Sequence, residues 1–228
     1  MQCLQLTRGE PAELVTGKML GDYAQGDTVY INENGSPVAF YVAKHDYESG
    51  LNGDGRTALL RSSTIGIYPI NSSGVNEYAG GEVDAFLNGD YLARFSPAAQ
   101  SLIGKTSFKY TTSANASAGN NTTTVLERAV FLPALNEVRE GSLMSPPVNN
   151  NEGTYMGLPS TIINALLSSI LNAAWTRSPC LATSQQVLNW TSAGLSSNYS
   201  DKHQEIFPML TLSAKAVFDE ATNVWKEK

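Results

Sequence analysis

Alternating apolar and polar residues near the start of the chain predict a β-hairpin. Val29 and Ile31 alternate with polar neighbours, and a second apolar run extends over residues 38–43. Between the two runs, Asn34 and Gly35 are residue types that adopt the positive φ angles of a two-residue hairpin turn. We therefore expect two antiparallel strands joined at this pair.

The spacing of the apolar residues changes further along the chain and there predicts helices. Apolar residues within 83–91 recur at intervals of three and four, as on one face of a short amphipathic helix. A second helix is expected from Pro97 to about Gly104, with the Ser96 side chain as its N-cap. The apolar run 162–174 is ambiguous, but its length favours a third helix.

The remaining chain has the pattern of strands, turns and loops. Residues 111–124 contain no bulky apolar side chain and predict an exposed loop, and residues 139–160 predict a second long loop. Apolar runs that follow or precede turn residues predict further strands at residues 58–61, 130–132, 187–190, 206–212 and 217–228.

Together these elements predict an α+β fold, a single β-rich and loop-rich domain with short helices over residues 25–215. We expect residues 1–24 to form a lead or assembly segment and residues 216–228 to form a C-terminal extension. Only 16% of the residues are charged, while Ser, Thr, Asn and Gly are abundant. This balance is typical of surfaces that are built on strands and turns.

The distribution of charge argues against a nucleic-acid or membrane partner. The net charge is −6, and the Lys and Arg residues form no cluster that could neutralise phosphates. Residues 1–20 lack the basic start and the continuous apolar core of a signal peptide. The run 162–174 is too short to span a bilayer. We therefore expect no nucleic-acid partner, no membrane insertion and synthesis in the cytoplasm.

The residues that carry enzyme chemistry form no recognisable set. His45 and His203 stand alone, no G-x-S-x-G or H-E-x-x-H motif occurs, and Gly104-Lys105-Thr106 lacks the first glycine of a phosphate-binding loop. Cys3 and Cys180 are far apart, so reduced thiols are expected, although a single bridge between them stays open. We predict no catalytic residue, no metal and no cofactor.

Two chemical alternatives stay open. Asp46, Glu48, Asn52 and Asp54 crowd one turn and offer the oxygen ligands that Ca²⁺ prefers. Their spacing differs from that of an EF-hand loop, and a solvated turn is the commoner explanation. A pair of glycosidase carboxylates could form among the 21 acidic residues, because the separation of two carboxylates is set by the fold and not by the sequence.

Five short motifs occur in an order that resembles a known family. They are Glu33-Asn34-Gly35-Ser36-Pro37 before Phe40-Tyr41-Val42, Val83 to Asn88 before Phe95-Ser96, Val130-Phe131-Leu132, Trp175-Thr176-Arg177-Ser178-Pro179, and Pro208 with Leu210 and Leu212. Over residues 25–215 they resemble an uncharacterised domain-of-unknown-function family of phage virion and surface proteins from Gram-positive gut bacteria. That family has the pattern W-L-N…F, V-F-L-L-S, W-x-R-S-P and R-P-x-x-x-L.

The resemblance implies a C-type-lectin-like fold, similar also to that of formylglycine-generating enzymes, in which few regular elements support long loops. The chain departs from the family pattern at Phe86 (usually Trp), Thr176 (Leu) and Phe207 (commonly Arg). These departures weaken any transfer of function. The related enzymes depend on a cysteine arrangement that Cys3 and Cys180 do not reproduce, so no catalytic residue is carried over.

The W-x-R-S-P motif is expected to have a structural role. Trp175 offers a large apolar face, Arg177 a planar fork of five donors for carbonyls or a carboxylate, and Pro179 the end of a strand. We therefore predict that Trp175 and Arg177 support the scaffold and do not contact a ligand.

The first functional hypothesis is a non-enzymatic structural protein of a phage virion, in a tail, baseplate or head decoration, with a role in host-surface recognition. The resemblance, the missing catalytic set and the loop-rich surface favour it. The protein would be made in the host bacterial cytoplasm and located in the virion. Its expected partners are other virion proteins or further copies of itself in a symmetric homo-oligomer.

The alternative is a bacterial or phage display domain that binds a glycan or a protein receptor. Residues 189–203 mix aromatic side chains with short hydrogen-bonding groups, a combination typical of binding loops because aromatic residues supply contact area at low entropic cost. An ordinary polar loop is the competing interpretation. The ligand-binding residues predicted in this segment, which resembles the variable positions of phage display proteins, are Asn189, Trp190, Asn198, Tyr199, Asp201 and His203.

Overall fold

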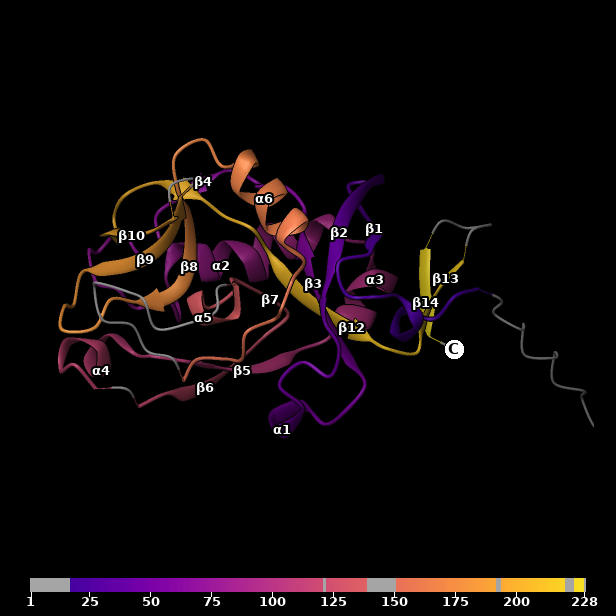
Figure 1. Ribbon diagram of the computed structural model, residues 1–228, viewed down its shortest axis with the longest axis horizontal. Coiled ribbons are helices and arrows are strands. Elements are labelled where there is room, and N and C mark those ends of the chain that lie inside the picture. Colours follow the sequence, from indigo (N-terminus) through magenta and orange to yellow (C-terminus); the bar gives the residue numbers. More distant parts are fainter. Residues whose placement is uncertain (1–16, 121, 139–150, 192–193, 220–223, 228) are drawn as a thin grey trace, which may run out of the picture.

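Two five-stranded sheets form the body of the molecule and lie next to each other along its long axis (Figure 1). The computed structural model describes residues 17–120, 122–138, 151–191, 194–219 and 224–227. The first sheet has the order β1 (Thr28–Glu33), β2 (Ser36–Lys44), β3 (Arg56–Arg61), β12 (Met209–Ser213) and β7 (Val130–Phe131). The second has the order β10 (Gly194–Tyr199), β9 (Gln186–Thr191), β8 (Ala174–Pro179), β11 (Gln204–Glu205) and β4 (Ile67–Tyr68).

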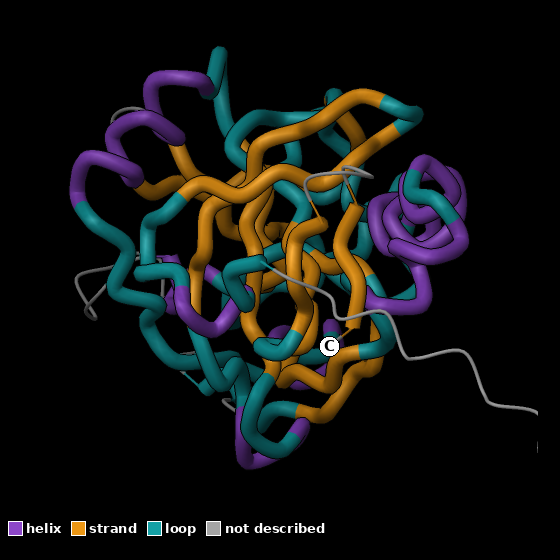
Figure 2. Tube along the Cα trace, turned by 90° about the vertical axis from the view of Figure 1, so that its right-hand side faces the viewer, coloured by secondary structure: helices purple, strands orange, loops and turns teal. Residues whose placement is uncertain are grey.

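Two hairpins and several short helices surround these sheets, and most helices lie at the periphery (Figure 2). The hairpins are β5 (Thr106–Tyr110) with β6 (Thr124–Arg128), and β13 (Ala216–Asp219) with β14 (Val224–Glu227). The α-helices are α1 (Ser49–Asn52), α2 (Glu82–Phe86), α3 (Pro97–Ile103), α4 (Ser113–Ser117), α5 (Leu135–Val138) and α6 (Ser160–Ser169). The protein is therefore β-rich, with short helices and long connections, as the sequence predicts.

The first hairpin forms where the sequence predicts it. β1 and β2 pair antiparallel with Glu33 opposite Ser36, which leaves a two-residue turn. Asn34 and Gly35 occupy that turn with φ of 51° and 79°. Positive φ at both central positions gives the turn a twist that matches the twist of the flanking strands. The adjacent strand β3, expected at residues 58–61, pairs with β2 and is buried.

The predicted helices also form, with local irregularities. α2 continues into a π-helical turn (Leu87–Tyr91) and a 3-10 turn (Leu92–Arg94). α3 begins after Ser96, whose hydroxyl accepts a hydrogen bond from the Ala99 N–H, and ends at Gly104, where φ is 54°. None of the helices in the described part of the chain is long and apolar enough to cross a membrane.

Two expectations need correction. Part of the predicted loop 111–124 is the helix α4, because the Thr112 hydroxyl caps its first turn and the small Ala116 side chain fits into the interior. The apolar run 162–174 does not form one helix: α6 ends at Ser169, and β8 begins at Ala174. Residues 139–150 of the second predicted loop lie outside the described residues.

The two ends of the described chain pack on the first sheet. Met19 forms an isolated bridge with Val217 of β13, and Leu20 is fully buried. The Trp225 indole of β14 donates to the Tyr30 carbonyl oxygen of β1 at 2.8 Å. Residues 216–219 and 224–227 of the predicted C-terminal extension are thus a hairpin against the domain, and residues 1–16 lie outside the described residues.

Aromatic side chains join the hairpin β5–β6 to the sheets. Phe108 of β5 stacks on Phe131 of β7 with ring centroids 4.5 Å apart, and Tyr47 stacks on the same Phe131 ring at 5.7 Å. In the second sheet, the Trp175 indole donates to the Tyr68 carbonyl oxygen at 2.9 Å. β5, β7 and β8 therefore surround one part of the interior, where the following cluster lies.

Candidate functional site

Arg177 of β8 is fully buried, and all five of its N–H groups have acceptors. Its Nε donates to the Lys109 carbonyl oxygen at 3.1 Å, and its Nη atoms donate to the carbonyl oxygens of Leu132 and Glu152, each at 2.8 Å. The two remaining N–H groups donate to the Glu137 carboxylate at 2.8 Å and 3.0 Å. The guanidinium is thus satisfied by this chain and has no donor left for a ligand.

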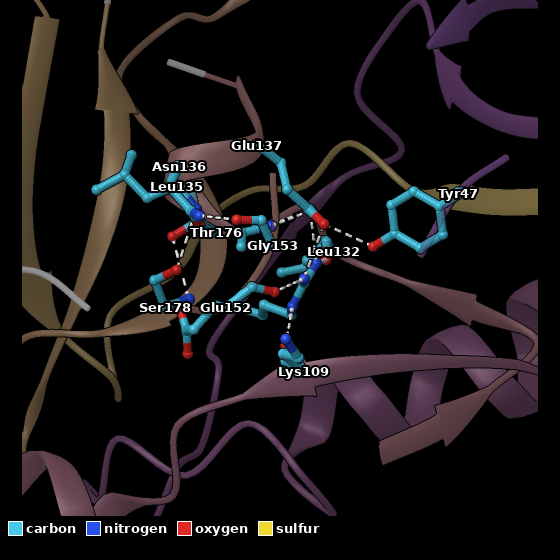
Figure 3. Close-up of polar contacts among 12 residues, drawn as sticks. Tyr47, Lys109, Leu132, Leu135, Asn136, Glu137, Glu152, Gly153, Thr176 and Ser178 are labelled. Carbon is cyan, nitrogen blue, oxygen red and sulfur yellow. Dashed lines mark hydrogen bonds and ion pairs between the residues drawn. The ribbon is translucent and has the colours of Figure 1, made fainter. Parts of the chain in front are cut away.

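Glu137 of α5 receives this charge and is itself fully satisfied. Besides the bidentate contact with Arg177, its Oε1 accepts from the Tyr47 hydroxyl at 2.6 Å and its Oε2 from the Ala134 N–H at 2.7 Å. Figure 3 shows the Tyr47 hydroxyl directed at the Glu137 carboxylate. Each carboxylate oxygen therefore accepts two hydrogen bonds, the condition under which a buried ion pair is tolerated.

The surroundings keep the Arg177 guanidinium charged and the Tyr47 hydroxyl protonated. Burial alone would lower the pKa of Arg177, but the Glu137 carboxylate raises that pKa above its usual value. Burial and then Glu137 raise the pKa of Tyr47 well above its usual value, so its hydroxyl remains a donor. The Arg177 guanidinium also lies 4.7 Å from the centre of the Phe108 ring, at a distance suited to a cation–π contact.

A second carboxyl, that of Glu152, lies beside this pair and is also fully buried. Its Oε1 accepts from the Thr111 N–H at 2.6 Å, while its backbone carbonyl accepts from Arg177. Burial raises the pKa of Glu152 to about 7, against the lowering influence of Arg177 and of hydrogen bonds from Ser178 and Thr111. This carboxyl therefore exchanges a proton near neutral pH, inside the protein.

An open pocket of about 630 Å³ adjoins the buried cluster. Its lining is polar and consists of Glu48, Lys109, Asn120, Thr122, Thr123, Asn151, Gly153 and Thr154. Arg177 donates to the backbone carbonyls of Lys109 and Glu152. Lys109 lines the pocket, and Glu152 lies between the lining residues Asn151 and Gly153. Glu48 follows Tyr47, whose hydroxyl binds Glu137. Three segments of the pocket wall are therefore attached to one buried ion pair.

Gly153 of the lining has no space for a side chain. A Cβ atom at this position would lie 2.5 Å from Glu137 Oε1 and 2.7 Å from Glu137 Cγ. Real side chains do not approach this closely, so any larger residue would displace the carboxylate from Arg177. Glycine is required here by close packing against the ion pair.

The comparisons with known proteins assign the chain to a family. Residues 54–214 match the model of a domain of unknown function, DUF6273, and this range is more than half of the chain. The chain belongs to the DUF6273 family. Comparisons with curated proteins and with solved structures found no match. Arg177, Glu137 and Glu152 lie within the DUF6273 range, whereas Tyr47 and Glu48 precede it.

The ligand-binding residues that the sequence predicts in this DUF6273 protein are divided between interior and surface. Asn189 is 2% exposed and donates to Gln204 Oε1 at 2.9 Å, and Trp190 is 4% exposed against Phe207. Both belong to β9, an inner strand of the second sheet, so neither side chain reaches the surface. Asn198 is half-buried, while Tyr199, Asp201 and His203 are exposed at the end of β10 and in the turn that follows.

His45 and Asn52, considered from the sequence for catalysis and for Ca²⁺ binding, form hydrogen bonds within the DUF6273 protein itself. His45 contacts Thr57 Oγ1 and the Tyr23 carbonyl, and Asn52 of the acidic turn is bound to Ser107 of β5. Among the described residues, no group of three or more His, Cys, Asp or Glu side chains could hold a metal ion. Cys180 is buried and burial raises the pKa of its thiol, whereas Cys3 lies outside the described residues.

The sequence indicates Arg177 but not its partners. Trp175, Arg177 and Pro179 share the W-x-R-S-P motif, and Pro179 is the last residue of β8. Glu137 is 40 residues away from Arg177 in the sequence, and Tyr47 is 90 residues away from Glu137. No spacing rule connects residues so distant in sequence. A buried arginine demands a carboxylate, but the sequence offers 21 acidic residues and does not say which one.

Replacing Arg177 by Met should lower the free energy of unfolding by about 3–5 kcal/mol, because Glu137 would then be a buried charge without a counterion. Denaturant titration measures this loss. The control is Arg94→Met: Arg94 is half-buried over the rings of Phe86 and Tyr91, and we expect a change within about 1 kcal/mol. Unchanged stability of the Arg177 variant would contradict a scaffold role.

The stability of the protein should fall as the pH rises from 5 to 8, because of Glu152. Its pKa is raised by folding, so the folded state binds the proton more tightly, and this advantage is lost as the pH rises through about 7. The contribution is on the order of 2 kcal/mol. Glu152→Gln should abolish this component of the slope in denaturant titrations at several pH values, whereas Glu127→Gln on the surface should retain it. Equal slopes in the parent and Glu152→Gln would refute the assignment.

Proposed function

We propose that the protein is a non-enzymatic structural protein of a phage virion, in a tail, baseplate or head decoration, and that it assembles with copies of itself. The observation that carries the assembly part is the outer strand β10. It pairs with β9 on one side and has no strand partner on its other side in the part of the chain that the structure describes. A six-residue edge of this kind offers main-chain donors and acceptors to another chain.

The composition of β10 favours pairing over protection. Natural edge strands are usually blocked by charged side chains, proline or bulges, and Gly194–Tyr199 contains no Lys, Glu, Asp, Arg or Pro. The register with β9 is continuous from Gly194 opposite Thr191 to Tyr199 opposite Gln186, without a bulge. Two copies of this edge can pair antiparallel about a two-fold axis, which gives the symmetric contact of a homo-oligomer.

β1, one of the two outer strands of the first sheet, differs in this respect. β1 is also an edge strand, but the Trp225 indole of β14 occupies the Tyr30 carbonyl oxygen on it. Its edge is therefore partly covered by the chain itself. We therefore prefer β10 to β1 as the self-association edge. Substitutions on β1 serve as controls.

The C-type-lectin-like architecture is part of the same proposal. Long connections join short strands here, as between β4 and β5 and between β7 and β8, and a rigid interior supports them through Arg177. A fold of this kind suits a virion protein because its loops can vary while the scaffold is retained. The location in the virion, after synthesis in the host cytoplasm, follows from the same hypothesis.

Ser196→Lys tests the assembly edge, because it places a charge on the exposed face of β10. We expect the parent to form a symmetric oligomer at high protein concentration and the variant to dissociate at least about tenfold more readily, as measured by light scattering after size exclusion. Thr28→Lys, an equivalent change at an exposed position of β1, should behave like the parent. A strictly monomeric parent, or equal association of Ser196→Lys and the parent, would rule out this edge.

A second candidate function, recognition of a host-surface glycan or protein, is favoured by the exposed side chains at the end of β10. Tyr199 is 48% exposed, and Asp201 and His203 are exposed in the following turn. An exposed aromatic ring beside short polar groups is the chemistry expected of a binding surface. With Asn189 and Trp190 in the interior, this smaller set is what remains of the predicted ligand-binding segment.

Tyr199→Ala should weaken recognition at this surface at least about tenfold, because the ring supplies most of the contact area there. The measurement is binding to an array of bacterial surface glycans. Tyr30→Ala is the matched control, since Tyr30 is similarly exposed, at 51%, but belongs to β1. No binding by the parent, or equal binding by the parent and Tyr199→Ala, would exclude glycan recognition by Tyr199.

A further inference from the structure

Among the described residues, the lining of the polar pocket beside the Arg177 cluster includes one cationic and one acidic residue, and neither forms an ion pair with another described residue. Lys109 and Glu48 both line it. The ion pairs of the described residues include neither of them, so their charged groups are also more than 4.0 Å from each other. By contrast Lys105, the residue just before β5, pairs with Glu127 at 3.5 Å. The pocket is thus lined by two residues of opposite charge.

We infer that this pocket binds a short polar zwitterion, a hydroxyl-rich amino acid or peptide, with its carboxylate on Lys109 and its ammonium on Glu48. This site goes beyond the proposed assembly role and does not depend on it, because β10 contributes no lining residue. A ligand of this class would neutralise both charges at once. A ligand with only one charge would leave the other unpaired.

The two charged residues are held apart by contacts within the fold. Lys109 alternates with the buried Phe108 and Tyr110 on β5, which turns its side chain to the outer face of the hairpin. Glu48 precedes α1 in a left-handed conformation, with φ of 47°, and α1 is bound to β5 through Asn52. The Lys109 carbonyl oxygen accepts from Arg177, and Tyr47, the neighbour of Glu48, donates its side-chain hydroxyl to Glu137. The separation is thus a property of the fold and not of two flexible side chains alone.

The rest of the lining selects a hydroxyl-rich, non-aromatic ligand. Thr123 and Thr154 carry hydroxyl groups that can donate and accept hydrogen bonds, and the Thr122 hydroxyl, which donates to Asn120, can still accept one. None of the described lining residues is aromatic, so they offer no stacking surface of the kind that a nucleobase or an aromatic ligand would use. A volume of about 630 Å³ is within the range of small-molecule sites and accommodates a peptide of a few residues.

Thr122 of the lining is bound by the side chains of two described residues. The Asn120 side chain accepts from the N–H and the hydroxyl of Thr122, and the Asn115 side chain of α4 donates to the Thr122 carbonyl. The helix α4 is in turn attached to the second sheet's connections through the Ala182 N–H, which donates to the Ala116 carbonyl. Thr122 is therefore held in place before a ligand arrives, which reduces the entropic cost of binding.

The parent protein alone gives the first test, by isothermal titration with four ligands: serine, triserine with free ends, N-acetyl triserine and triserine amide. We expect triserine with free ends to bind at least about tenfold more tightly than either blocked peptide, since each block removes one charge-assisted contact. Comparable binding of serine would identify an amino-acid site, and weak binding of serine a peptide site. Absence of binding by serine and triserine, or equal binding of free and blocked peptides, would overturn the inference.

The variants then assign each charge. Lys109→Met should bind triserine about tenfold more weakly and should no longer distinguish triserine from its amide, because the carboxylate has lost its partner. Glu48→Gln should likewise lose the distinction between free and N-acetylated peptide. Lys105→Met, a change just before β5 and outside the described lining, should bind like the parent. Retained discrimination in Lys109→Met, or an equal loss in Lys105→Met, would place the ligand elsewhere.

The outcome of this test is separate from that of the assembly hypothesis. Oligomer formation depends on the edge of β10, and Ser196→Lys should bind triserine like the parent. Loss of triserine binding in Ser196→Lys would show that the pocket requires the oligomer and would contradict its independence. Melting temperatures of Lys109→Met and Glu48→Gln close to that of the parent would establish that changes in affinity come from the site.

Discussion

The permanent positive charge of Arg177 in the interior is the constraint on which the rest of the site depends. An arginine cannot discard its proton, so burial obliges the fold to supply acceptors for five N–H groups at fixed angles. Glu137 provides two of these contacts, and the carbonyls of Lys109, Leu132 and Glu152 provide the others. Three segments, at residues 109, 132–137 and 152, therefore meet at the Arg177 side chain. The specificity of this arrangement comes from the geometry of the guanidinium more than from its net contribution to stability.

The polar pocket is a consequence of the same constraint. Its walls include backbone segments that Arg177 and Glu137 hold directly, and Gly153 has no side chain because Glu137 occupies that space. The DUF6273 match includes the ion pair but begins after Glu48, so the pocket combines the matched domain with the turn that precedes it. A ligand that binds both Lys109 and Glu48 would thus contact the matched domain and the turn that precedes it. The buried Arg177–Glu137 pair helps to position both residues.

Local signals in the sequence predicted local structure well, and distant partners poorly. The pair Asn34-Gly35 determines a tight turn by its φ angles, so the first hairpin was confirmed at its expected position. The helix α4 was missed because its small residues show no apolar stripe. Trp190 was expected on a binding surface, but β9 is an inner strand that is buried on both faces, which aromatic content alone does not reveal. The partners of Arg177 depend on the tertiary fold and could not be read from spacing.

Hydrogen exchange of individual backbone amides in the parent and in Arg177→Met tests most directly whether the buried ion pair holds the pocket. The Thr111 N–H is bound to the Glu152 carboxylate, and the Met156 N–H to the Glu137 carbonyl oxygen. If Arg177 anchors these segments, both amides should exchange much faster in the variant, while amides of the β1–β2 hairpin keep their protection. Unchanged exchange at both amides, or an equal increase throughout the first hairpin, would contradict this account.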